Sequence, residues 1–178
     1  AAAAQGLIQP LDAAALDDAG WHPLARSLGH VSDSVYGLPF ALDALVLASS
    51  AQEPFLDWQA VSDAGTIAFN VNDASFPLAL YLSAGGELTD AQGKLTLNET
   101  VLTRVLTLFA QGQFLPLKSD AEVASVLGQG SAFAVGWANG FLNSEQAEVQ
   151  LEALPGLEGT PATLVTSWSW SVASADVE

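Results

Sequence analysis

The 178-residue sequence has no cysteine, no methionine and only four basic residues. Without cysteine there are no disulfides, thiolate metal ligands or cysteine nucleophiles. With 20 acidic residues the net charge is −16, which argues against nucleic acid or an anionic membrane surface as partners. No apolar run approaches the roughly 18 residues of a membrane span. Because residue 1 is alanine, we expect a processed or excised chain whose export signal was removed or lies upstream.

Apolar residues, in contrast, make up 50% of the chain, enough for one domain with a substantial core. The first third is rich in loops. Extended segments are expected at 35–48, 66–69, 131–136, 147–154 and 163–172. Helices are expected at 11–20, 55–63, from 76 to the Gly85-Gly86 pair, from 98 to 112, and from 119 to 128. This alternation predicts an α/β domain with a mixed β-sheet flanked by helices.

Residues suited to catalysis or metal binding form no recognisable motif. Asp43 and Asp73 are candidates for a glycosidase-type carboxylate pair, but with 20 acidic residues chance pairs are common. His22 and His30 are not at a metal-binding spacing, and packed or solvated histidines are the ordinary interpretation. Nucleotide-binding and hydrolase motifs are missing. We therefore expect a protein that is not an enzyme and needs no metal or cofactor.

Several aromatic residues lie beside polar ones at the ends of expected elements. Trp137 follows a buried strand, Phe76 begins a helix close to Asp73, and Trp168 lies on the last extended segment. An indole face can stack on the C–H face of a sugar ring while neighbouring carboxylates and amides bind its hydroxyls. For any single tryptophan, a place in the core is the commoner role, so both interpretations stay open.

Four stretches of the sequence, in this order, resemble the extracellular sugar-binding, maltose-binding-protein-like, solute-binding proteins of ABC importers. The stretches are YGLPFALDALVL (36–47), FNVNDASFPLALY (69–81) closing on AGG (84–86), GSAFAVGW (130–137), and LPG (154–156) followed by TSWSWSV (166–172). Together they span nearly the whole chain.

The resemblance implies a periplasmic-binding-protein-like lobe. Residues 1–34 would be a first-lobe remnant or linker, 35–48 a hinge crossing strand, 49–162 the ligand-binding second lobe, and 163–178 the return hinge strand. A full member is about twice this length, so the chain resembles the second lobe with its hinge segments. The family's tyrosine and asparagine after the first crossing are replaced by Ala48 and Ser49.

The resemblance also implies a function: binding of a small neutral solute, probably a carbohydrate, by two-lobe closure for delivery to an ABC permease outside the cytoplasm. The implied ligand contacts are Asp43, Asp73, Phe76, Trp137, Asn139 and Trp168. Asn139 is included because the match at Trp137 slips by a residue or two. The alternative is a stand-alone interaction domain, derived from such a lobe, that self-associates through an apolar face.

Overall fold

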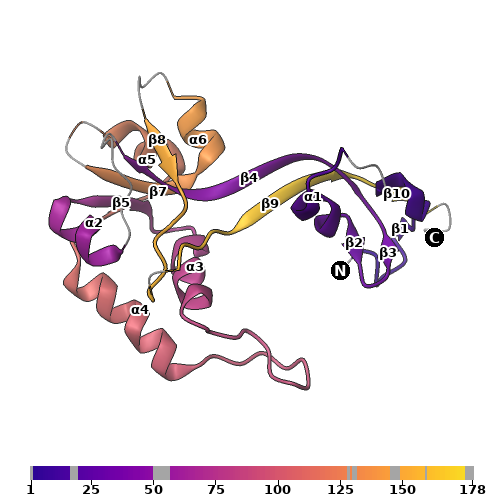
Figure 1. Cartoon of the computed structure of the whole chain (residues 1–178), viewed down its shortest axis with the longest axis horizontal. Coiled ribbons are helices and arrows are strands. Elements are labelled where there is room, and N and C mark those ends of the chain that lie inside the picture. The colour runs from indigo at the N-terminus through magenta and orange to yellow at the C-terminus, as the bar shows by residue number, and fades with distance from the viewer. Residues whose placement is uncertain are drawn as a thin grey trace. The chain divides into compact units, whose positions relative to one another are not determined.

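The computed structural model describes residues 2–16, 20–49, 57–127, 129, 132–144, 149–158 and 160–174. The chain forms two compact units, one of Ala44–Leu164 and one of Ala1–Asp43 with Val165–Glu178. Strand β4 (Leu38–Ser49) begins in the flanking unit and ends in the central one. Figure 1 labels most elements of both units.

A mixed sheet forms the centre of the unit Ala44–Leu164. Its strand order is β6-β5-β7-β4-β8. The strands besides β4 are β5 (Ile67–Asn70), β6 (Phe114–Leu117), β7 (Phe133–Trp137) and β8 (Gln150–Glu152). Strand β5 is parallel to both β6 and β7, and β4 is antiparallel to β7 and β8. The predicted α/β class with a mixed sheet flanked by helices is confirmed.

Helices cover both faces of this sheet because its inner strands alternate between two apolar cores. On β4, Leu45 and Leu47 face one core, while Val46 and Ala48 face the other. The first core is closed by α2 (Trp58–Ala64), α3 (Ser75–Ser83) and α4 (Glu99–Gln111). The second is closed by α5 (Asp120–Val126) and α6 (Ala138–Leu142).

In three of these helices, the side chain before the first turn accepts a hydrogen bond from a backbone N–H that has no partner within the helix. The Asp57 carboxylate accepts a hydrogen bond from the Ala60 N–H, and Asn98 Oδ1 accepts one from the Val101 N–H. Ser119 caps α5, as its capping-box sequence predicts, but Glu122 accepts from the N–H of Lys118 instead of that of Ser119. Local sequence therefore sets most helix starts.

Strand β6 and helix α1 were not anticipated from the sequence. Pro116 interrupts the apolar run of β6, but β6 lies at the edge of the sheet, where a proline is tolerated. Pro23 opens α1 (Pro23–Leu28), since the first helical turn needs no N–H partner. The helix expected at 11–20 is a 3₁₀ helix, η1 (Ala13–Leu16), with residues 17–19 outside the described ones.

The flanking unit contains short pairings. Strand β1 (Ile8–Gln9) is antiparallel to β10 (Val172–Ala173), and β2 (His30–Val31) is antiparallel to β3 (Ser34–Val35). Strand β9 (Val165–Trp170) pairs with β4. Gly37 lies so close to this strand that an added Cβ would come 2.9 Å from the Cβ of Ser169. Any larger residue at position 37 would therefore push this segment away from β9.

Candidate functional site

The carboxyl ends of three parallel strands meet at one edge of the central sheet. Asn70 ends β5, Asp120 opens the helix that follows β6, and Trp137 ends β7. Leu45 of β4 lies at the same edge because it pairs directly with Trp137. In open α/β sheets, ligands bind in the crevice outside the carboxyl ends of the strands. This edge is therefore the place to look for a binding site.

Asp73 and Trp137 are joined by a hydrogen bond across this edge. The indole Nε1 of Trp137 donates to Asp73 Oδ2 at 3.0 Å. The other carboxylate oxygen, Asp73 Oδ1, accepts from the Ser75 N–H at 2.8 Å and from the Ser75 hydroxyl at 2.6 Å. The carboxylate thus fixes the start of α3 and the orientation of the indole ring together.

The same hydrogen bonds determine the protonation of Asp73. Burial of the carboxyl raises its pKa, but hydrogen bonds from the Ser75 hydroxyl, the Ser75 N–H and the Trp137 indole together lower the pKa below its ordinary value. Each of these donors favours the ionised form. Asp73 is therefore an anionic hydrogen-bond acceptor at neutral pH.

This lowered pKa predicts a pH-dependent stability. Ionised Asp73 stabilises the folded chain fully above the unfolded carboxyl pKa of about 4, and the contribution is lost as the pH falls through the lower folded pKa. In Asp73→Asn this contribution is missing. We expect the wild-type advantage in free energy of unfolding to be constant from pH 7 to about pH 5 and to shrink below about pH 4.

Urea unfolding of both proteins between pH 2 and pH 7 measures this difference. Asp33→Asn, at an exposed position of the flanking unit, is the control and should change the pH profile little. An advantage that grows on acidification would contradict the assignment.

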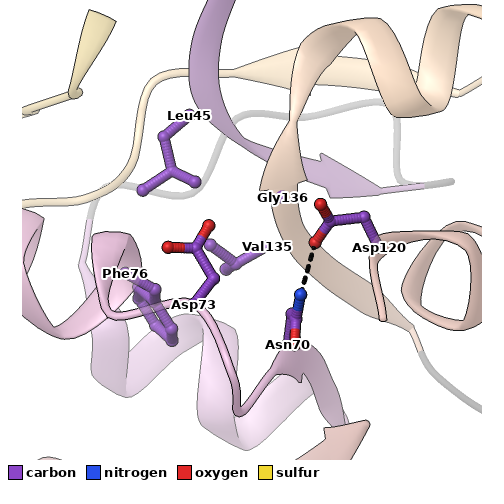
Figure 2. Close-up of a pocket in the computed structure, with 7 residues that line it drawn as sticks. All are labelled: Leu45, Asn70, Asp73, Phe76, Asp120, Val135 and Gly136. Carbon is purple, nitrogen blue, oxygen red and sulfur yellow. Dashed lines mark hydrogen bonds between the residues drawn. The ribbon is translucent and has the colours of Figure 1, made fainter. Parts of the chain in front are cut away.

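A small hollow lies beside the Asp73 carboxylate, with a volume of about 10 Å³. It is lined by Leu45, Asn70, Asp73, Phe76, Asp120, Val135 and Gly136. Figure 2 shows the hydrogen bond across it from Asn70 Nδ2 to Asp120 Oδ1, 2.9 Å long. A volume near that of one water-sized probe admits a single hydroxyl and not a whole ring. Either of the two carboxylates beside such a hollow is suited to accept the one hydrogen bond that this hydroxyl donates.

The structure brings three of the sequence-predicted contacts together in the unit Ala44–Leu164: Asp73, Phe76 and Trp137. Phe76 lines the hollow but is only 3% exposed. Its ring packs against Trp58 and Phe109, with centroid distances of 5.3 Å to each. Phe76 therefore acts chiefly in the core, and its direct contact with a ligand stays a prediction.

Of the other three predicted contacts, one belongs to the same unit and two belong to the flanking unit. Asn139 is on the exposed side of α6, where its Oδ1 accepts from Asn143 Nδ2 at 2.9 Å. Asp43 and Trp168 belong to the flanking unit, Asp43 buried and Trp168 exposed on β9. Their part in ligand binding stays a prediction.

Two polar residues at the edge were missed in the sequence: Asn70 and Asp120. Asn70 ends β5, and Asp120 opens the helix that follows β6, so a position at or just beyond a strand end was the available signal. This signal was missing for Asp120 because β6, the strand before it, was not expected. In the part of the chain that the structure describes, no three metal-binding side chains cluster, and no helix is long and apolar enough to cross a membrane.

The sequence matches no protein-family model and no curated protein. Solved structures, however, are similar over nearly its whole length. The GacH receptor of Streptomyces glaucescens, solved without ligand and with acarbose, has a TM-score of 0.74 at 17% identity, covering 98% of this chain and 54% of the receptor. Maltose-bound MalE3 of T. maritima has a TM-score of 0.74 at 15% identity, over 94% of this chain and 53% of that protein.

A cyclo/maltodextrin-binding protein in complex with maltotetraose has a TM-score of 0.75 at 17% identity, covering 97% of this chain and 52% of that protein. The chain therefore spans about half the length of these proteins. At such identities the likeness establishes the fold. The periplasmic-binding-protein-like fold expected from the sequence is confirmed: this chain has the architecture of a lobe of a sugar-binding solute receptor.

Proposed function

We propose that the chain binds a carbohydrate, without catalysis, at the edge formed by Asp73 and Trp137. The observation that carries the proposal is the hydrogen bond between these two side chains, which holds an indole ring beside an ionised carboxylate. The similar solved structures include complexes with maltose, maltotetraose and acarbose. A sugar is therefore the ligand class to test first.

The geometry suits a sugar for two reasons. A carboxylate has about four lone-pair positions, and Asp73 uses three of them for Ser75 and Trp137, which leaves one for a sugar hydroxyl. The indole ring, held by its N–H, can stack its apolar face on the C–H face of a pyranose. Asn70 and Asp120 supply further polar contacts beside the hollow.

The same chemistry argues for binding over hydrolysis. A glycosidase needs a protonated carboxyl as general acid, with a pKa raised toward neutrality. The pKa of Asp73 is lowered instead, because its hydrogen bonds stabilise the anion. Asp73 is therefore suited to accept a hydroxyl proton in a hydrogen bond and unsuited to donate one to a leaving group.

We extend the proposal to solute uptake. The resemblance in sequence and fold supports delivery of the bound sugar to an ABC permease, outside the cytoplasm, after closure of two lobes on the ligand. Asp43, Asn139 and Trp168 are proposed as further ligand contacts in that process. Because the chain spans about half the length of the similar receptors, two-lobe closure and delivery to a permease are proposed for a receptor of full length.

Titration with maltose, maltotetraose and acarbose, followed by intrinsic tryptophan fluorescence, tests the proposal. Trp137 is one of five tryptophans, and its ring is expected to respond when a sugar stacks on it. We expect a saturable change with at least one sugar and none with the sugar alcohol mannitol, which lacks a pyranose ring. A flat response from a folded sample across the series would contradict the proposal.

A second candidate function, self-association, is favoured by an apolar ribbon in the flanking unit. The ribbon comprises the exposed side chains of Phe40, Leu42, Trp168 and Trp170 on β4 and β9. Phe40 and Trp170 lie with ring centroids 5.1 Å apart. Analytical ultracentrifugation of the titrated sample separates the candidates, because a sugar-binding monomer supports the first and a ligand-free dimer that binds no sugar supports the second.

A further inference from the structure

A second, larger hollow adjoins the candidate sugar site and is almost entirely apolar. It has a volume of about 390 Å³ and lies between the segment after β5 and helix α4. It is lined by Phe69, Val71, Asn72, Asp73, Ala74, Pro77, Leu102, Val105, Leu106 and Phe109. This volume is within the range of small-molecule sites, about 300–1,000 Å³. Asp73 lines both hollows, so the two adjoin the same residue.

The hollow arises because α4 has a wider apolar stripe than the core covers. Val105 is buried against the sheet, but Leu106, one position on, is 59% exposed. Val71, on the segment opposite, is 55% exposed. Leaving two large aliphatic side chains in water on facing walls is unfavourable, and an apolar ligand group between them would remove that surface from water.

Most hydrogen-bonding groups at this hollow are already engaged, and the remaining acceptor position of Asp73 is the one assigned above to the sugar hydroxyl. Asn72 Nδ2 donates to the Lys118 carbonyl, and the Asn72 N–H donates to Asn70 Oδ1. Asp73 directs its oxygens to Ser75 and Trp137. Pro77 has no N–H to offer. Among these lining residues, all within the described part of the chain, little is left to bind the hydroxyls of a second sugar ring. The chemistry of the hollow therefore fits a hydrocarbon group.

We propose that this groove binds the apolar aglycone of a glycoside whose sugar ring lies at Asp73 and Trp137. The inference rests on the proposed function, because it adds an apolar group to the sugar bound there. It narrows the ligand class from sugars in general to glycosides with an alkyl or aryl substituent. Because Asp73 lines both hollows, a sugar bound at this residue would place its aglycone beside the groove.

Calorimetric titration with methyl maltoside and hexyl maltoside, the latter below its micelle concentration, tests the inference. Each fully buried methylene strengthens binding about fourfold, and a hexyl group has about five more methylenes than a methyl group. Because the groove is open to solvent, we expect a total gain of about tenfold to a hundredfold. Leu106→Gln, which keeps the helix propensity and much of the volume, should reduce the gain to about threefold or less and leave methyl maltoside affinity unchanged.

Leu95→Gln is the matched control, because Leu95 is 82% exposed and does not line the groove. The hexyl preference should survive in this variant; if it falls as it does in Leu106→Gln, the alkyl chain binds elsewhere and the inference is overturned. Equal affinities of the two maltosides for the wild-type protein overturn the inference and leave the sugar site standing. If neither maltoside binds, the proposed function fails and the inference fails with it. If Leu106→Gln weakens maltotetraose as much as hexyl maltoside, the groove is a sugar subsite and the aglycone assignment is wrong.

Discussion

Replacement of Trp137 by alanine should nearly abolish sugar binding. Truncating a central aromatic residue of a binding site costs about 2–4 kcal/mol, which raises the Kd about 30-fold to 1,000-fold. The loss combines two effects: the stacking surface disappears, and Asp73 Oδ2 loses its indole donor. Isothermal titration calorimetry with the best-binding sugar of the fluorescence series measures the change.

Two companion variants make the result specific. Trp137→Phe retains an aromatic face but removes the N–H, so we expect a smaller loss, about tenfold or less. Trp170→Ala removes an exposed indole of the flanking unit and should leave affinity unchanged. Unaltered affinity in a folded Trp137→Ala protein would show that the sugar does not bind at this residue.

Replacement of Phe76 by alanine should have its main effect on stability. The ring lies at the centre of an aromatic cluster that joins the sheet to α2, α3 and α4, with Phe69 and Phe114 at centroid distances of 5.8 Å and 6.1 Å. Emptying such a position costs about 3–5 kcal/mol, a large part of the total stability of a domain. Urea unfolding followed by circular dichroism measures the loss.

Phe76→Leu separates packing from recognition. Leucine refills much of the space, so this variant should lose about 1–2 kcal/mol of stability and retain its sugar affinity. The opposite pattern, a stable Phe76→Leu protein with weakened binding, would show that the ring contacts the sugar directly. That outcome would support the role implied by the family resemblance.

The local elements could be predicted because their signals lie within a few residues of one another. Helix α4 begins after the cap Asn98 and ends before Gly112, as expected from the sequence. An apolar run followed by turn residues located β5 and β7 to within one or two residues. Where two signals conflict locally, as with Pro116 in an apolar run, the sequence was insufficient, because the edge position that tolerates this proline comes from strand pairing.

The candidate site depends on contacts between distant residues. Asp73 and Trp137 are 64 positions apart, and Asn70 and Asp120 are 50 apart. The sequence placed Asp73 and Trp137 at element ends but missed Asn70 and Asp120, because the order of the strands decides which ends meet. The family resemblance named Asp73, Phe76 and Trp137 among six expected contacts; the structure adds the hydrogen bond that joins Asp73 to Trp137.

The sequence by itself determined the α/β class, most element positions, the acidic character and the exclusion of cysteine chemistry, because these follow from composition and local periodicity. Only the tertiary structure decided that Phe76 is buried, that Leu106 faces an open groove, and that Asp73 is held ionised. An amphipathic pattern marks which side of a helix is apolar. How much of that side becomes buried depends on neighbours from distant parts of the chain, and so does the pKa of a carboxyl.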